Sequence, residues 1–200
     1  MHCYLRGMTR SPIPRKADLA ALKTLANPLR QRILELLNAE GPSTSTTLAA
    51  KLGVTSGGTS YNLRVLAEFG FVEEVEGKGH GRERWWRAVR TDLRMPLHSE
   101  QDEPTRTAVA ELHRLWLTAD LAAFERLEAE REAMGEWGDA LPYSRGQIRV
   151  TLGELGDFFE EYLALLRRYQ RPEGETPAGA RLVQTRCLAF PDPRTEDEMS

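Results

Sequence analysis

A cluster of hydroxyl, amide and basic side chains occupies residues 55–64 of this 200-residue chain. Side chains of these types form hydrogen bonds with base edges and with phosphate oxygens, so their chemistry suits nucleic acid. On a helix over residues 56–69, the stripe of Thr59, Leu63 and Leu66 would be buried and most of the cluster would lie opposite. The residues expected to contact DNA here are Thr55, Ser56, Gly57, Ser60, Tyr61, Asn62 and Arg64.

A second group of basic side chains follows in a glycine-rich segment. Residues 71–76 alternate apolar and acidic side chains, residues 77–81 favour a turn, and residues 82–89 return as a strand. This pattern predicts a β-hairpin whose tip carries the basic residues Lys78, His80, Arg82 and Arg84. A solvent-exposed hairpin accounts for the charges alone, but its place directly after two helices and a glycine turn favours contact with phosphate.

Two helices are predicted ahead of the cluster. The first begins at Asp18, and the second begins at Asn27, a good N-cap, with Pro28 as its first residue. Gly41, which is followed by proline, ends this second helix. Its outer face is expected to carry three polar residues, either solvated or in contact with phosphate: Arg30, Gln31 and Arg32.

A helix, a glycine turn and a further helix carry the cluster itself. Ser45 is the expected cap of a helix over residues 46–52, Gly53 closes it in the left-handed conformation, and Thr55 caps the next helix. Two glycines near the start of that next helix cost about 1 kcal/mol each relative to alanine. Their lack of side chains favours a close approach of the backbone to DNA.

Three segments in this order resemble the winged-helix regulators of the ArsR family, especially the metal-independent branch common among actinobacteria. They are residues 25–34 (LANPLRQRIL), 60–66 (SYNLRVL) and 81–87 (GRERWWR), and the likeness covers roughly residues 17–90. The resemblance implies a homodimeric transcription factor, usually a repressor. Its recognition helix would enter the major groove, and its wing would meet the backbone or the minor groove.

The chain departs from the metal-sensing members of that family. Those members resemble one another in a Cys-x-Cys segment on the helix before the turn or in His and Asp ligands on the last helix, and this chain has no thiol at the first of these sites. Metal sensing through that first site is therefore not expected. Cys3 and Cys187 are far apart in the sequence, and the isolated spacing of His98 and His113 disfavours a metal site. Asn62 stands where many relatives have histidine, which affects fine specificity. No metal and no cofactor are expected.

The second half is predicted to be mainly helical. A long helix runs over residues 104–133, and another begins with the capping box of Thr151 and Glu154. Residues 147–150 and 180–190 alternate as strands do, which predicts a small strand–helix–strand module.

The predicted fold is therefore α+β, mainly α. Residues 16–94 form a winged helix-turn-helix DNA-binding domain, and residues 95–190 form a dimerisation or effector domain from the long helix and the strand–helix–strand module. Residues 1–15 are expected to be a flexible tail, and residues 191–200 a disordered acidic tail.

Two roles remain open for the second half. As a scaffold for a homodimer, it would act together with the first helix through Leu19, Leu22, Val109, Leu112, Trp116, Ala119, Leu152, Leu155 and Phe159. As a sensor of a small-molecule effector, it would line an apolar pocket with Trp116, Phe124, Trp137, Tyr143, Phe159 and Tyr162.

Charge is divided unevenly along the chain. Residues 1–94 carry 15 Lys and Arg against 9 Asp and Glu, a net +6, whereas residues 95–200 carry 12 against 21, a net −9. A basic half suits a polyanion, so double-stranded DNA is the expected partner. The alternative is a winged-helix module that binds another protein without sequence-specific contact to DNA.

Other function classes find little support in the residues present. An enzyme is not expected, because the chain has no Ser, His and Asp grouping, no phosphate-cradling glycine loop before a lysine and no paired histidines on one helix. No apolar run approaches the roughly 18 residues of a membrane span, and the first residues lack the apolar core of a secretion signal. We therefore expect no membrane partner and a cytoplasmic location.

Overall fold

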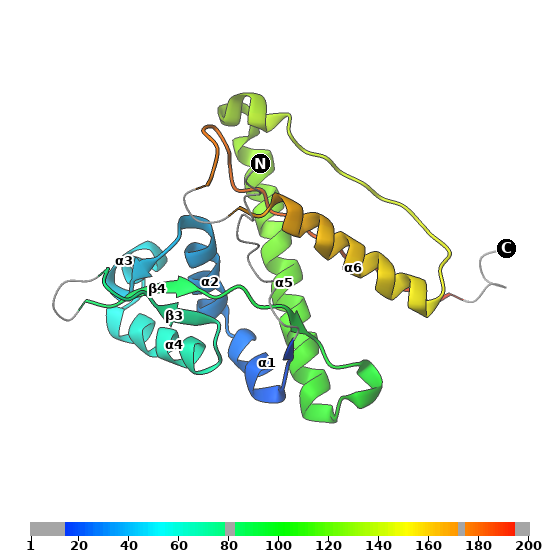
Figure 1. The fold of residues 1–200 in the computed structure, drawn as a ribbon, viewed down its shortest axis with the longest axis horizontal. Helices are drawn as coiled ribbons and strands as arrows, with labels where there is room; N and C mark the ends of the chain where they lie inside the picture. The colour runs from blue at the N-terminus through cyan, green and yellow to red at the C-terminus, as the bar shows by residue number, and fades with distance from the viewer. Residues whose placement is uncertain (1–14, 79–82, 172–174, 195–200) are drawn as a thin grey trace, which may run out of the picture. The chain divides into compact units, whose positions relative to one another are not determined.

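The chain divides into two compact units, residues 1–141 and residues 142–200. The structure, a computed structural model, describes residues 15–78, 83–171 and 175–194. Figure 1 shows helices in both units, and the strands lie in the first.

Local sequence signals set the helix ends of the first unit. Its helices are α1 (Leu19–Leu25), α2 (Pro28–Glu40), α3 (Ser45–Leu52), α4 (Ser56–Glu68) and α5 (Glu103–Glu130). Side-chain oxygens of Asp18, Asn27 and Thr55 accept N–H groups in the first turns of α1, α2 and α4, which confirms the predicted caps at Asn27 and Thr55 and the predicted start of a helix at Asp18. Gly53 closes α3 in the left-handed region, as predicted. The cap of α3 is Thr44, one residue before the predicted Ser45.

A three-stranded antiparallel sheet forms the wing and anchors it. Its strands are β2 (Ser43–Thr44), β3 (Val72–Glu74) and β4 (Trp85–Ala88), in the order β2-β4-β3. Pairing of β3 with β4 confirms the predicted hairpin, whereas β2 was not predicted because two residues carry too short a pattern. The tip, residues 79–82, lies outside the described residues.

A second pairing ties the start of the unit to α5. Strand β1 (Arg15–Lys16) runs parallel to β5 (Leu93–Arg94), which the sequence did not predict. A short 3-10 helix, η1 (His98–Glu100), then leads into α5, and α5 lies along α1 (Figure 1).

The core of the first unit gathers the apolar faces of all five α-helices and the inner side of the sheet. Its most deeply buried side chains are Leu22, Ile33, Leu48, Thr59, Leu63, Leu66, Val72 and Leu112. Because α5 contributes Leu112 to this core, it is part of the winged-helix unit.

This core corrects part of the predicted dimer surface. Leu22, Val109 and Leu112 are buried within their own chain, so they are not exposed for a second copy. Leu19, Trp116 and Ala119 are half-buried. An apolar stripe shows which side of a helix is covered, and here α1 and α5 cover each other.

The second unit contains α6 (Leu152–Tyr169) and extended chain. The predicted capping box is confirmed, because Thr151 and Glu154 exchange hydrogen bonds at the start of α6. The strands predicted over 147–150 and 180–190 are wrong, since neither segment has a ladder partner. Alternating side chains make a strand only where another strand satisfies the backbone N–H and C=O groups. The predicted strand–helix–strand module is therefore a helix with extended flanks.

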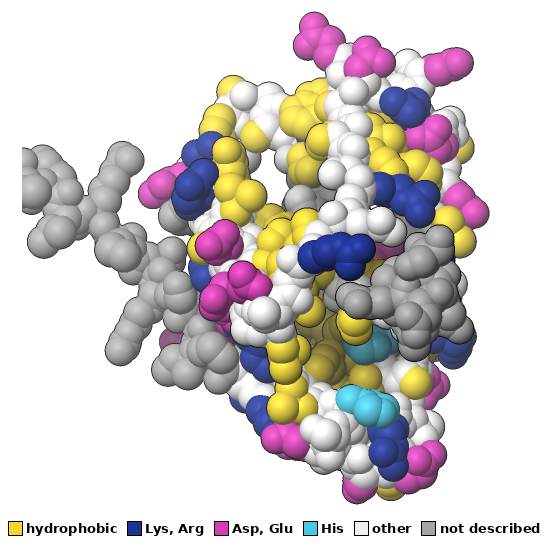
Figure 2. Space-filling model, turned by 90° about the vertical axis from the view of Figure 1, so that its right-hand side faces the viewer, with side chains coloured by type: hydrophobic (Ala, Val, Ile, Leu, Met, Phe, Trp, Pro, Cys, Tyr) yellow, Lys and Arg dark blue, Asp and Glu magenta, His cyan; other side chains and the backbone are white. Residues whose placement is uncertain are grey.

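No residue in the described part of the second unit is buried. Figure 2 shows hydrophobic side chains open to solvent among charged ones on one face of the molecule. The long helix of the first unit also ends earlier than expected, at Glu130, and continues as the 3-10 helix η2 (Arg131–Gly138). The predicted tails fall mostly outside the described residues, although Arg15 is paired in β1.

Candidate nucleic-acid interface

The outer side of α4 carries most of the residues assigned to DNA contact from the sequence. Exposed on or beside it are Thr55, Ser56, Gly57, Tyr61 and Arg64, with Ser60 half-buried. Tyr61 leaves 58% of its surface exposed, so its ring is available to another molecule. Arg64 Nε donates to the Ser60 carbonyl at 3.3 Å, which uses one of the five guanidinium N–H donors.

Hydroxyl groups hold the first turn of α4. Thr55 Oγ1 accepts the Gly58 N–H at 3.2 Å, and Thr59 Oγ1 donates to the Thr55 carbonyl at 3.1 Å. A methyl group added at Gly57 would meet no other atom within 4 Å. The packing of the chain therefore does not require glycine at position 57. Because Gly57 has no side chain, the backbone at this position is open to solvent.

Asn62 does not belong to the exposed side. It is only 9% exposed, its Oδ1 accepts from Arg30 Nε at 2.9 Å, and its Nδ2 donates to the Gly58 carbonyl at 2.9 Å. Both ends of the amide are occupied within the protein, so the predicted DNA contact by Asn62 is corrected to an internal role. The spacing of Asn62, three residues after Thr59 and four before Leu66, was the sequence signal for the buried side of α4, whereas its partner, Arg30, stands 32 residues away.

The outer face expected for α2 is also different. Arg32 is exposed as predicted, but Arg30 and Gln31 are half-buried and hydrogen-bonded to the end of α1. These two residues therefore contact other helices of the same chain and do not form an exposed face.

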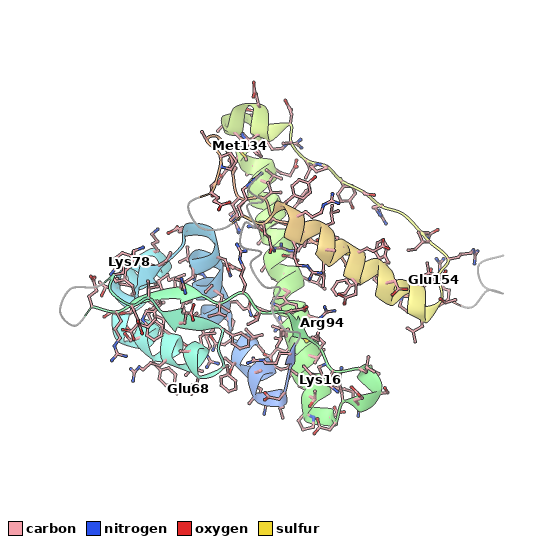
Figure 3. The ribbon with its side chains drawn as sticks, in the orientation of Figure 1. Lys16, Glu68, Lys78, Arg94, Met134 and Glu154 are labelled. Atoms are coloured by element: carbon pink, nitrogen blue, oxygen red, sulfur yellow. The ribbon has the colours of Figure 1, made fainter. Side chains whose placement is uncertain are left out.

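The wing presents basic groups next to acidic ones. Lys78 lies at the end of the hairpin that leads into the tip (Figure 3), with its Nζ 4.8 Å from the centroid of the Trp85 ring. Arg84 Nη1 is 3.6 Å from Glu74 Oε2, in a pair whose side chains are 63% and 47% exposed. His80 and Arg82 lie outside the described residues.

A polar cleft joins α4 to the wing. It is lined by Thr44, Ser45, Thr46, Ser60, Arg64, Glu83, Arg84 and Trp86. Arg64 of α4 and Arg84 of the wing thus face one surface together with the start of α3. Ser45 and Thr46 were not among the predicted contact residues, although their hydroxyl groups at the start of a helix were a signal that could have identified them.

The predicted effector residues are divided between the units. Trp116, Phe124 and Trp137 belong to the first unit, whereas Tyr143, Phe159 and Tyr162 belong to the second. Trp116 Nε1 donates to Gln31 Oε1 at 3.2 Å, and the rings of Phe159 and Tyr162 stack with centroids 6.5 Å apart.

The part of the chain that the structure describes contains neither a metal-binding cluster nor a membrane-spanning helix. No group of three or more His, Cys, Asp or Glu side chains is placed to hold a metal ion. None of the described helices is long and apolar enough to cross a membrane.

Residues 25–75 match the family model of a helix-turn-helix domain. This segment runs from the end of α1 through α4 and β3. No curated protein matches the chain. Together with the wing sheet described above, the match shows a winged helix-turn-helix fold.

Solved structures that match parts of this chain include proteins from three bacteria. Reduced HlyU from Vibrio cholerae is 19% identical, over 49% of this chain and 86% of its own, with a TM-score of 0.31. The homodimeric winged helix-turn-helix DNA-binding domain of Mb0332 from Mycobacterium bovis, a possible ArsR-family transcriptional regulator, is 24% identical, over 52% of this chain and 80% of its own, with a TM-score of 0.32. ZitR from Lactococcus lactis is 17% identical over 72% and 84%, also with a TM-score of 0.32.

Proposed function

We propose that the chain is a DNA-binding transcriptional repressor that acts as a homodimer on an inverted-repeat operator. The observation that carries the proposal is the cleft in which Arg64 of α4 and Arg84 of the wing converge with hydroxyl groups of α3 and α4. Guanidinium and hydroxyl groups on one exposed surface match the phosphates and base edges of a duplex.

In this proposal α4 enters the major groove. Arg64 and Tyr61 are exposed on the groove side, where an arginine side chain is suited to a bidentate contact with guanine. Ser56 and the bare backbone at Gly57 lie at the start of the helix, where N–H groups face a phosphate at short range.

The wing would bind the sugar-phosphate backbone. Lys78 and Arg84 carry this role among the described residues. The ion pair between Arg84 and Glu74 is exposed and 3.6 Å long, so exchanging Glu74 for a phosphate costs little.

Leu22, Val109 and Leu112, which the sequence analysis assigned to the dimer contact, are buried within one chain, so the homodimer must use another surface. On α5 a second apolar stripe is exposed, formed by Leu117, Leu121 and Phe124 at intervals of four and three residues. We assign the contact with a second copy to this stripe, because pairing the two stripes removes apolar area from water. In such a dimer the two copies of α4 are related by a two-fold axis. The two half-sites would then lie about one helical turn, near 10 bp, apart.

The test is salt-dependent binding of the full chain to DNA from its own upstream region. Arg84→Ala should weaken binding to all sequences and lower the slope of log K against log salt by about one. Arg64→Ala should cost about 1–3 kcal/mol at the operator and chiefly relax sequence preference. Arg126→Ala, an exposed arginine on α5 away from the cleft, is the matched control and should change neither quantity.

If the wild-type chain bound DNA from its own upstream region no more tightly than non-specific DNA, the proposal would be contradicted and a protein-binding winged helix would be favoured. Dimer formation is checked separately by light scattering, where Leu121→Glu should give monomers. Repression is checked with a reporter placed behind the operator, whose expression should rise when the gene for this chain is removed.

A further inference from the structure

Two neighbouring residues of α2 donate hydrogen bonds to the last carbonyl groups of α1. Arg30 Nη1 donates to the Thr24 carbonyl at 3.1 Å, and Gln31 Nε2 donates to the Leu25 carbonyl at 2.8 Å. The last carbonyls of a helix lack intrahelical partners, so these side chains satisfy groups that would otherwise remain unpaired. Both donors are half-buried, which makes the two contacts stronger than the same pairs on an open surface.

Each of the two side chains also reaches a different helix. Arg30 Nε donates to Asn62 Oδ1 of α4 at 2.9 Å, and Gln31 Oε1 accepts from Trp116 Nε1 of α5 at 3.2 Å. Asn62 in turn donates to the Gly58 carbonyl at 2.9 Å. Hydrogen bonds therefore link Trp116 on α5 to the first turn of α4 in two parts, which are joined through the adjacent residues Thr24 and Leu25 at the end of α1 and Arg30 and Gln31 in α2.

That first turn is the part of α4 with the weakest intrinsic tendency to be helical. Gly57 and Gly58 follow one another, and each glycine costs about 1 kcal/mol relative to alanine in a helix. The turn depends on side chains instead: Thr55 caps the Gly58 N–H, and Asn62 holds the Gly58 carbonyl. Asn62 keeps this orientation because Arg30 fixes the other end of its amide.

We propose that Arg30 is a positioning residue that orders the first turn of α4, and that Trp116 transmits the state of α5 to this turn through Gln31. The consequence for DNA binding rests on the proposed function, but the connection itself is a property of the free protein. A ligand or partner that moves Trp116 would loosen the turn that carries Ser56 and Gly57, and so weaken binding without touching the DNA surface.

The competing role for Arg30 is direct contact with phosphate. Two of its five N–H donors are already engaged, yet the remaining ones allow such a contact. The two roles differ in what they predict. A phosphate contact changes the salt slope and leaves the free protein as it was, whereas positioning changes the free protein and leaves the slope unchanged.

The experiment measures amide hydrogen exchange at Gly58 and Thr59 in the full-length chain without DNA. Arg30→Met keeps the aliphatic stem and removes the donors, and exchange at both amides should become about tenfold faster, the size of one net hydrogen bond. Asn62→Asp keeps the acceptor for Arg30 and removes the donor to Gly58, so it should give a similar increase. Asn62→Asp also serves as the test if Arg30→Met does not fold.

Transmission from α5 is measured in the same way. Trp116→Phe keeps an aromatic ring and removes the Nε1 donor, and should speed exchange at Gly58 and Thr59 about threefold. Trp85→Phe is the control, because its Nε1 donates to Glu83 in the wing and takes no part in the connection. Unchanged exchange in Arg30→Met and Asn62→Asp would overturn the positioning role, and unchanged exchange in Trp116→Phe would overturn the transmission.

A DNA titration then separates this inference from the proposed function. With operator DNA, Arg30→Met should reduce affinity about tenfold at an unchanged salt slope, and a slope lowered by about one would show a phosphate contact instead. If the wild-type chain binds no DNA, the proposed function fails. The exchange measurements still decide whether Arg30 and Trp116 order the first turn of α4.

Discussion

Helices α4 and α6 carry equally regular apolar stripes, but their surroundings differ completely. In α4 the stripe of Leu63 and Leu66 is 0% exposed. In α6 the corresponding stripe begins with Leu152, which is 89% exposed, and no residue of the helix is buried. The same periodicity therefore produces a core in one region and an open apolar face in the other.

The difference means that different interactions stabilise the two helices, tertiary packing in α4 and local hydrogen bonds in α6. Each leucine buried in the core contributes about 1.5–3 kcal/mol, so tertiary packing holds α4 even though its first turn contains two glycines. Helix α6 is held by local interactions, above all the capping box of Thr151 and Glu154. Substitutions that act on packing and on capping should therefore separate the two regions.

The largest effect is expected from a core truncation in α4. Leu63→Ala should lower the free energy of unfolding by about 2–5 kcal/mol, because it leaves a cavity among fully buried side chains. Leu165→Ala in α6, at a position 45% exposed, is the matched control and should change it by about 0.5 kcal/mol or less. Urea unfolding followed by circular dichroism measures both. A loss at Leu165 as large as that at Leu63 would mean that the apolar face of α6 is covered in solution.

A smaller effect is expected from removing the helix caps. Thr151→Ala and Thr55→Ala each delete a cap worth about 1 kcal/mol. Without a core behind it, α6 should fray along much of its length, whereas fraying in α4 should stop at the first turn. Amide exchange mapped along the two helices shows this as a wide zone of faster exchange in one and a narrow zone in the other. Equal zones would contradict the contrast between packed and unpacked helices.

Features set by residues close in sequence were predictable, which explains the success with helix starts. Asp18, Asn27 and Thr55 each bond an N–H three residues ahead, so the cap is visible in a short stretch of sequence. The exposed side of α4 followed from the same periodicity. Asn62 was expected to contact DNA, although its spacing of three residues from Thr59 and four from Leu66 places it on the buried stripe of α4. Its partner, Arg30, stands 32 residues away and was not predictable from a local pattern.

Features that depend on distant partners were not predictable from local patterns. The stripe of Val109 and Leu112 on α5 indicated a covered face, but not that α1 of the same chain covers it. Residues 180–190 alternate as a strand does, yet have no partner strand. Ser43 and Thr44 do pair with β4 although no pattern marked them. In each case the deciding contact lies far away in the sequence.

The smallest effect is expected from pH, acting on the carboxylate caps of α5 and α6. At the start of α6 (Figure 3), the Thr151 N–H donates to Glu154 at 2.7 Å and its hydroxyl donates to the same oxygen, and these bonds lower the pKa of Glu154. Hydrogen bonds from Thr105 lower the pKa of Asp102, which caps α5, in the same way. A carboxyl whose pKa is lowered on folding stabilises the helix above its unfolded pKa, and this contribution is lost as the pH falls through the folded value.

Acidification below the ordinary pKa of about 4.3 for glutamate should therefore loosen the first turn of α6, and acidification below about 3.9 for aspartate that of α5. The response should be wider in α6 because α5 is also held by its buried Leu112. Glu154→Gln keeps an acceptor without a titrating proton, so exchange at the start of α6 should lose its dependence on pH, after correction for intrinsic exchange. Glu161→Gln, on the same helix away from the cap, should keep that dependence. If α6 in the Glu154→Gln variant responded to acid as the wild type does, the capping box would not be the interaction that holds this exposed helix, and contacts elsewhere would have to take its place.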